Sequence, residues 1–266
     1  MREKSWKSKI QWLVDFDGKK AALFRKNVRL RIDGIKGMVW DLLGEMEVKM
    51  KEELLFFEKS WDLEKEGLMV DMNLLVDDWR YKGIGYSFVT DKRNIREGGA
   101  LGFDGSTWLL RRVMREKKLK HLFMVRKIVD GKEEWDFDRV KWSEFGRKLK
   151  YWKECLLILV HLTAGGPSRS KEVLSIRRRN GDMVIRNVFV DDGMVSLVVG
   201  YVKGSSKSMK GSTVMRFLPE RVGRLLVWYL WLLCPFVELM QMRVRKMKRV
   251  GEFIWESKLE TTLGQL

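Results

Sequence analysis

The chain has 266 residues, of which 45% are hydrophobic and 33% are charged, and its net charge is +17. This length supports one or two domains with a buried core, and the composition argues against wholesale disorder. The longest apolar run, 225–237, has 13 residues, whereas a membrane-spanning helix needs about 20. The N-terminus lacks the apolar segment of a secretory signal. We therefore expect an intracellular protein, bound to no membrane, in which Cys155 and Cys234 are free thiols.

The first 140 residues contain helical and loop-like stretches. Residues 1–36 mix basic and apolar side chains around a turn at Val14–Gly18. Apolar residues recur every three or four positions over 38–57, which predicts a helix. The glycine-rich stretch 82–105 is typical of a loop, and 106–121 is typical of a basic helix. We expect 1–140 to form a helical N-terminal region.

The second half begins with a helix over 140–162, for which either Asp136 or Asp138 is a suitable N-cap. A short helix over 169–178 follows the break at Gly165–Ser168. Two β-branched runs, 183–190 and 194–202, flank the hairpin signal Asp191-Asp192-Gly193. A third strand is expected over 213–218, and Pro219 then opens another helix. The sequence thus predicts a mainly α protein with a small hairpin or three-stranded sheet, and a second domain over 141–266.

Basic charge is densest between Arg169 and Arg249, which hold 17 Lys and Arg against 6 Asp and Glu. Such a concentration attracts polyanions and favours nucleic acid as a partner. A basic surface without any partner is the alternative. Two Cys and two His at unrelated spacings give no zinc site, and no P-loop is present. We therefore expect no metal, nucleotide or other cofactor.

Arg169 lies where a helix dipole is already positive, so its position is unfavourable unless an anion binds there. Its planar fork suits a phosphate group, and Glu172 lies on the same helix face. Lys203, at the expected hairpin tip, can reach a second oxygen or protonate a leaving group. The alternatives are a solvated Arg169 and a mobile basic loop in which Lys207 and Lys210 are equivalent to Lys203.

These features resemble the tyrosine recombinases, which are also called phage integrase-like recombinases. In that family an Arg in a turn and helix with a following Glu precedes a hairpin lysine and an Arg-x-x-Pro strand exit. Arg169, Glu172, Lys203 and Arg216–Pro219 occupy matching places. Residues 161–235 look most like the recombinase-like region of fungal telomere-associated, RecQ-type helicase-like proteins of repeated elements. Gly85–Phe88 and Asp91–Asn94 resemble the same family further upstream, which implies a core-binding-like domain from about 80.

The chain departs from this family where the chemistry is completed. No histidine follows His161 and no tyrosine follows Tyr229, whereas the family needs a His/Arg box and a tyrosine nucleophile. Tyr229 lies in an apolar helix and is expected to pack there. The resemblance thus implies a truncated, catalytically inactive domain in which Arg169 and Lys203 are vestiges of the catalytic set.

We expect this domain to bind the DNA backbone in the nucleus. The predicted phosphate-binding residues are Arg169, Lys171, Arg177, Arg178, Arg179, Lys203, Lys207, Lys210 and Arg216. Arg177–Arg179 also suit the negative end of the preceding helix without any ligand. The composition leaves a second possibility open. Ala, Thr, Gln, Pro and His, whose codons all need cytosine at the first or second position, are scarce, which fits a gene degraded by C-to-T mutation. The alternatives are a nonfunctional relic, or half of a split recombinase completed by another chain.

Overall fold

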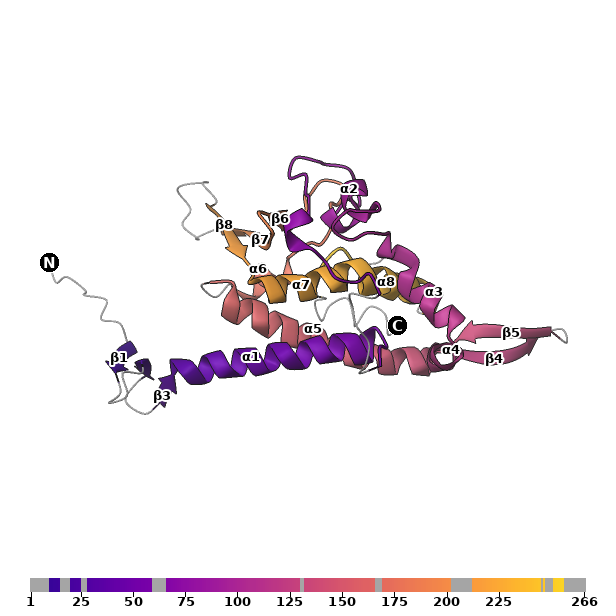
Figure 1. Ribbon diagram of the computed structural model, residues 1–266, viewed down its shortest axis with the longest axis horizontal. Coiled ribbons are helices and arrows are strands. Elements are labelled where there is room, and N and C mark those ends of the chain that lie inside the picture. Colours follow the sequence, from indigo (N-terminus) through magenta and orange to yellow (C-terminus); the bar gives the residue numbers. More distant parts are fainter. Residues whose placement is uncertain are drawn as a thin grey trace. The chain divides into compact units, whose positions relative to one another are not determined.

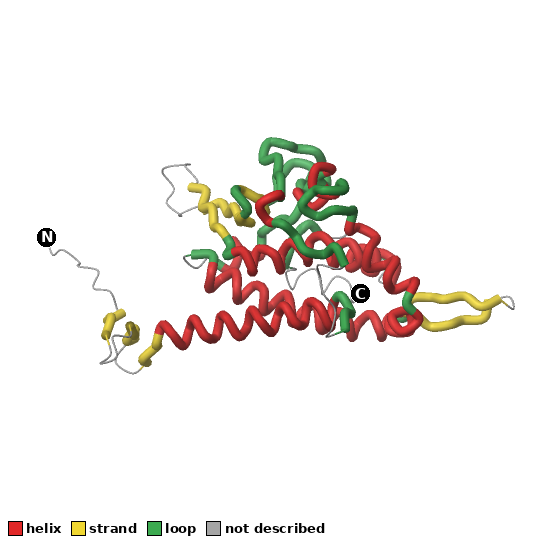
Figure 2. The backbone as a smooth tube through the Cα atoms, in the orientation of Figure 1, coloured by secondary structure: helices red, strands yellow, loops and turns green. Residues whose placement is uncertain are grey.

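The computed structural model describes residues 10–14, 20–24, 28–58, 66–129, 132–165, 169–201, 212–244, 246 and 251–255. The chain divides into two units, Met1–Glu45 and Met46–Leu266. The architecture is mainly helical, with a three-stranded antiparallel sheet in the second unit, as predicted, and with an additional two-stranded hairpin (Figures 1 and 2). The expected division at residue 140 stays a prediction.

The first unit contains an antiparallel sheet that the sequence analysis did not predict. Its strands β1 (Ile10–Val14), β2 (Lys20–Phe24) and β3 (Val28–Arg31) pair in chain order. The register pairs Trp12 with Ala22 and Ala22 with Leu30. Most of the expected Val14–Gly18 turn lies outside the described residues.

Helix α1 (Ile32–Lys49) follows β3 directly and continues as the π-helix η1 (Met50–Leu54), which matches the predicted helix over 38–57. The π turn closes where the Leu55 N–H donates to the Met50 carbonyl at 2.9 Å. Phe56 then adopts a φ of 60°, a left-handed conformation that ends the helix.

The loop predicted over 82–105 belongs to a longer irregular stretch with four single turns. These are η2 (Met72–Leu74), η3 (Phe88–Thr90), α2 (Lys92–Ile95) and η4 (Gly105–Thr107). Asp71, Asp91 and Asp104 each accept a hydrogen bond from the N–H two residues later. Aspartate side chains therefore begin three of the four turns, as their short acceptor groups favour.

The predicted basic helix over 106–121 is two helices, α3 (Trp108–Arg115) and α4 (Lys117–Phe123). Glu116 breaks them because its backbone is extended, with φ −87° and ψ 116°. A hairpin of β4 (Met124–Val129) and β5 (Lys132–Phe137) follows, which the sequence analysis did not predict.

Helix α5 (Arg139–Thr163) is the predicted helix over 140–162. Asp138 is its N-cap, because its carboxylate accepts from the N–H groups of Val140 at 2.7 Å and Lys141 at 2.9 Å. The other candidate cap, Asp136, instead pairs with Lys127 across the hairpin at 2.6 Å.

A three-stranded sheet follows the short helix α6 (Ser170–Leu174). Its strands are β6 (Val188–Asp191), β7 (Met194–Tyr201) and β8 (Ser212–Phe217), with β7 in the centre. Asp192 and Gly193 form the β6–β7 turn with φ values of 47° and 71°. Positive φ at both positions is the mark of a type I′ hairpin, which the Asp-Gly pair predicts. The first predicted strand is shorter than expected, because 183–187 are not in the ladder.

The core helix runs as α7 (Glu220–Trp228), η5 (Tyr229–Leu233) and α8 (Cys234–Val244). Pro235 has no N–H and would crowd the carbonyl four residues earlier, and the widened π turn just before it accommodates the ring. By length and composition, this is the one helix among the described residues that could cross a membrane, but 78% of its apolar window is buried inside the protein. Such burial is typical of a core helix.

Candidate nucleic-acid interface

Arg169 stands at the start of α6 with its side chain 62% exposed. Its backbone N–H donates to Glu172 Oε2 at 3.1 Å, and the Glu172 N–H donates to the Arg169 carbonyl at 2.9 Å. Arg169 Nε lies 3.9 Å from Glu172 Oε1. Glu172 therefore fixes the backbone of this turn, as half of a capping box does, while the Arg169 guanidinium faces solvent.

Helix α6 contacts β7, and β8 pairs with β7 on the sheet. Arg216 on β8 lies opposite Leu197 and is partly exposed. The structure thus brings the helix of Arg169 and the strand of Arg216 to the same central strand. The side chain of Lys171 lies outside the described residues, as do Lys203, Lys207 and Lys210 between β7 and β8.

Internal ion pairs join three consecutive arginines to the segment 251–255 and to helix α8. These arginines are Arg177, Arg178 and Arg179. Arg177 Nη1 donates to Glu252 Oε2 at 2.5 Å, and its guanidinium lies 4.7 Å from the centre of the Phe253 ring. Arg179 Nη1 donates to Glu238 Oε2 at 3.1 Å.

Arg178 is the most enclosed of the three arginines, with 7% of its surface exposed. Its guanidinium pairs with Glu238 and donates to the Gly251 carbonyl at 2.7 Å. These contacts occupy the guanidinium inside the protein. The role of Arg178 in this structure is therefore to join α8 and residues 251–255 to the chain around it.

The sequence analysis missed a polar network centred on Arg186, a single arginine within a run of apolar residues. Its guanidinium forms an ion pair with Asp77, and both side chains are fully buried. Arg186 also donates through Nη1 to Asn180 at 3.2 Å and through Nε to the Val188 carbonyl at 3.1 Å. The Asp77 carboxylate accepts from the Val190 N–H at 3.1 Å. These bonds fasten the stretch after η2 to strand β6.

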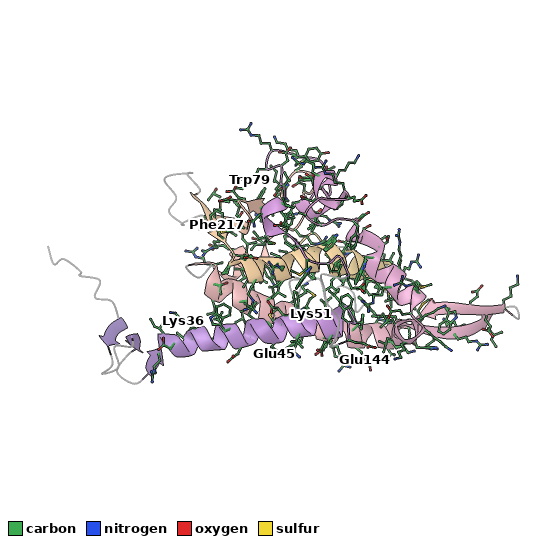
Figure 3. All side chains as sticks on the ribbon, viewed as in Figure 1. Lys36, Glu45, Lys51, Trp79, Glu144 and Phe217 are labelled. Carbon is green, nitrogen blue, oxygen red and sulfur yellow. The ribbon has the colours of Figure 1, made fainter. Side chains whose placement is uncertain are left out.

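Aromatic rings complete this network. The Arg186 guanidinium lies 4.7 Å from the Tyr86 ring centre and 4.6 Å from that of Phe189. The Trp79 Nε1–H donates to the Val190 carbonyl at 3.0 Å, and Trp79 (labelled in Figure 3) packs 5.2 Å from Phe189. Tyr86 and Asp91 belong to the two upstream motifs that carried the family resemblance. Their observed contacts give both residues a packing role.

Neither Tyr86 nor Tyr229 has the environment of an activated nucleophile. Burial and a 2.7 Å hydrogen bond to Asp91 raise the pKa of Tyr86 to about 12, so its hydroxyl stays protonated at neutral pH. Tyr229 is 3% exposed and packs 5.9 Å from Trp152, as predicted. Among the described residues, no three His, Cys, Asp or Glu side chains gather in a way that could hold a metal ion.

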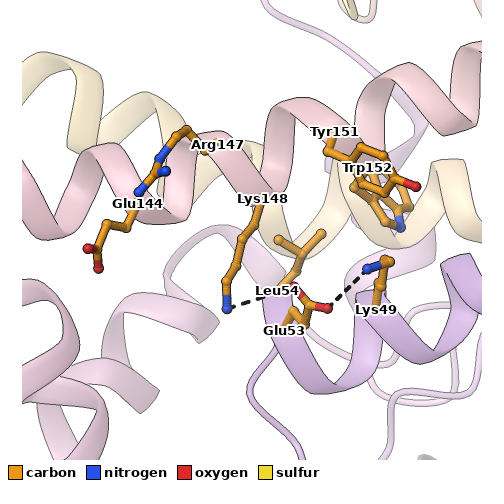
Figure 4. Close-up of a pocket in the computed structure, with 8 residues that line it drawn as sticks. All are labelled: Lys49, Glu53, Leu54, Glu144, Arg147, Lys148, Tyr151 and Trp152. Carbon is orange, nitrogen blue, oxygen red and sulfur yellow. Dashed lines mark hydrogen bonds and ion pairs between the residues drawn. The ribbon is translucent and has the colours of Figure 1, made fainter.

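A hollow of about 400 Å³ lies between the end of α1–η1 and α5 (Figure 4). Glu53 lies in its wall, 3.3 Å from the Lys49 ammonium and 3.7 Å from that of Lys148. Glu144 and Arg147 add one charge of each sign. The charges of the wall are thus mixed and largely paired with one another, so this hollow offers no concentrated field for an anion.

No protein-family model matches the chain, and no solved structure is significantly similar to it. Inferences about function therefore depend on the residues and their geometry.

Proposed function

We propose that this protein binds DNA through the phosphate backbone, as a tyrosine recombinase-like domain of a fungal repeated element that does not itself transfer strands. The observation that carries the proposal is the exposed guanidinium of Arg169, presented by a turn that Glu172 fixes. The proposed partner is DNA and the proposed compartment is the nucleus.

The order of elements supports the recombinase-like part of this proposal. Arg169 precedes a short helix, the β7–β8 connection contains Lys203, and Arg216 leaves the sheet just before Pro219 and α7. This is the order that the family resemblance implies for the phosphate-binding part of the site.

Charge placement supports the binding part. Acidic residues inside the protein, such as Asp77, Glu116, Glu238 and Glu252, neutralise buried or partly buried arginines. Pairs of one base and one acid leave the net charge unchanged, so the excess of +17 is carried by other basic side chains. Phosphates that bind such a surface release counterions, which makes the affinity dependent on salt.

We do not propose strand transfer, which in the resembled family depends on a His/Arg box and a tyrosine nucleophile. Residues 219–266 contain no histidine, and their one tyrosine is the buried Tyr229. A phosphate held by Arg169, Lys203 and Arg216 would have its charge stabilised.

The test is binding of the purified chain to a fluorescent duplex, followed by anisotropy. We expect Arg169→Ala and Lys203→Ala each to weaken binding about 5- to 20-fold, as the loss of one charge-assisted phosphate contact does. Lys92→Ala removes an exposed charge from α2 and is the control, with an expected change below about twofold. Arg169→Lys keeps the positive charge but removes the bidentate fork, so we expect a loss of affinity that is smaller than that of Arg169→Ala.

Two results would count against the proposal. A chain that does not bind duplex even at low salt favours the nonfunctional relic. Equal losses for Arg169→Ala, Lys203→Ala and Lys92→Ala mean that binding follows total charge and not this surface.

A further inference from the structure

We propose that the corner between α3 and α4 is a second nucleic-acid contact, in which Arg111, Arg115, Lys117 and Lys118 bind backbone phosphates. This inference rests on the proposed function and extends it to a surface outside 169–216. The run Arg111–His121 holds six basic residues and one acidic residue, a net of +5 in 11 residues.

The six basic side chains of this run are one buried arginine, Arg112, one half-buried lysine, Lys120, whose ammonium lies 4.3 Å from the centre of the Trp135 ring, and four outward cations. Leu109 and Val113 of α3 and Leu119 and Phe123 of α4 are all buried, which turns the opposite faces of both helices to solvent. The side chains on these outer faces are exposed at Arg111, Arg115, Lys117 and Lys118. The extended backbone of Glu116 places the two faces at a corner.

The one carboxylate within the run is committed to the buried arginine. Glu116 lies 2.9 Å from Arg112 Nε, and Arg112 Nη2 donates to the Phe56 carbonyl at 2.9 Å. The Arg112 guanidinium also lies 4.1 Å from the Phe57 ring centre. Glu116 thus compensates the charge of the core arginine.

The outward cations have no such compensation. Among the described residues, no carboxylate forms an ion pair with Arg111, Arg115, Lys117 or Lys118. Glu66 and Asp104 do line the 200 Å³ hollow beside Arg111 and Arg115, so the field is strongest on the outer faces of the corner and weaker within the hollow.

The corner fits a phosphate backbone better than a lipid surface. An amphipathic helix binds a membrane by inserting its apolar face, but Leu109, Val113, Leu119 and Phe123 of α3 and α4 are already buried in this protein, and only Met114 and Leu122 of the large apolar side chains on these two helices are exposed. The four outward cations have long side chains, which suits a polymer that carries one charge per about 1.7 Å of its axis.

The corner is distinct from the surface around Arg169 and Arg216. Strand β7 contacts α7, whereas α3 contacts η5, the next part of the same helix (Figure 1). Nine residues separate the starts of α7 and η5, which corresponds to about 14 Å at the rise of an α-helix. The two surfaces therefore lie beside different parts of the core helix.

The experiment compares the full chain with a fourfold variant, Arg111→Gln, Arg115→Gln, Lys117→Gln and Lys118→Gln, and with the double variant Lys117→Gln, Lys118→Gln. Lys92→Gln with Arg96→Gln, two exposed cations of the α2 region, is the control matched to the double variant. Binding to a 30-base-pair duplex is measured at several salt concentrations. We expect the fourfold variant to lose at least about tenfold in affinity and its log–log salt slope to fall in magnitude by about 3 to 4. In the double variant we expect the salt slope to change by about half as much as in the fourfold variant. In the control pair we expect a smaller change of slope than in the double variant.

The possible outcomes separate this inference from the proposed function. If the chain binds duplex and Arg169→Ala weakens it, but the double variant behaves like its control, the corner is not a contact and the inference fails alone. If the unmodified chain does not bind duplex at all, the proposed function fails as well. Binding to phosphatidylserine vesicles that the fourfold variant abolishes, with no effect on duplex, would assign the corner to a membrane and overturn it. Circular dichroism and the double variant guard against a fourfold variant that fails to fold.

Discussion

Arg186 and Asp77 form an ion pair in which both side chains have 0% of their surface exposed, although Asp77 lies 109 residues earlier in the chain. Asn180 and the Val188 carbonyl take up further donors of the same guanidinium, and the Tyr86 and Phe189 rings lie over it. The pair therefore joins the irregular stretch before Tyr86 to the sheet next to the proposed binding surface.

Because the pair is buried, loss of either partner leaves an uncompensated charge in the core. We expect Asp77→Asn and Arg186→Met each to lower the free energy of unfolding by about 3–5 kcal/mol in urea titrations. The control is Lys127→Ala, which removes an exposed pair with Asp136 and is expected to leave the stability nearly unchanged. If the core and surface variants have equal stability, the buried pair does not hold these segments together.

Asp91 makes the stability of the protein depend on pH in the acidic range. Hydrogen bonds from the Arg93 side chain, and then from Tyr86, lower the pKa of Asp91 to about 2 from its ordinary 3.8. A carboxyl with a lowered folded-state pKa stabilises the fold above its unfolded pKa, and this stabilisation is lost as the pH falls through the folded value. We expect the unfolding free energies of the native chain and Asp91→Asn to differ by up to about 2 kcal/mol above pH 5, less any screening at the half-exposed Arg93. The difference should shrink between about pH 4 and pH 2. A difference that does not change with pH would contradict this pKa.

Gly193 is required by the type I′ turn between β6 and β7. Its φ is 71°, and a Cβ placed there would lie 2.6 Å from Asn73 Oδ1. We expect Gly193→Ala to destabilise the protein by about 1–2 kcal/mol, through backbone strain and this contact. Gly146→Ala is the opposite control, since Gly146 lies inside α5 with no neighbour within 4 Å of its Cβ position, and alanine should stabilise it by up to about 1 kcal/mol. Equal thermal shifts in the two variants would show that the turn tolerates a side chain.

Substitutions of Arg178 and Arg169 should have opposite effects: one lowers the stability of the fold and the other lowers the affinity for DNA. Arg178→Ala removes one of the two arginines that pair with Glu238 and also the bond to the Gly251 carbonyl, so we expect a loss of about 2 kcal/mol in unfolding free energy. In the fraction that stays folded at low temperature, we expect its duplex affinity to match that of the unmodified chain. Arg169→Ala should show the reverse, with unchanged stability and weaker binding. A folded Arg178→Ala chain that loses affinity would place Arg178 at the DNA.

Elements with strong local signals could be predicted from the sequence. The long helix over 140–162, the Asp-Gly turn and the strand before Pro219 depend on short-range patterns, and they occur at or near their expected places. The break at Glu116 and the hairpin that follows α4 were missed. Charged residues occupy consecutive positions in both strands of the hairpin, and Lys127 lies opposite Glu134. Such strands lack the apolar pattern that identifies buried ones.

The candidate site shows the same limit for charged residues. Arg169 and Arg178 both lie near one short helix, and the local sequence predicts the same phosphate-binding role for both. Glu238, which lies 59 residues after Arg179, decides that the cluster packs inward. Arg186 was missed because its partner Asp77 is still more distant. Pairings of this range depend on tertiary packing, which local periodicity does not contain.

The salt dependence of duplex binding tests the central claim most directly. The unmodified chain is titrated with a 30-base-pair duplex from about 50 to 200 mM salt, beside Arg169→Ala. We predict a steep linear fall of log affinity with log salt concentration, with Arg169→Ala weaker throughout and its slope smaller in magnitude by about 1, since one phosphate contact is lost. No binding at 50 mM salt, or the same slope and affinity for both chains, would contradict the claim that Arg169 presents a phosphate-binding surface.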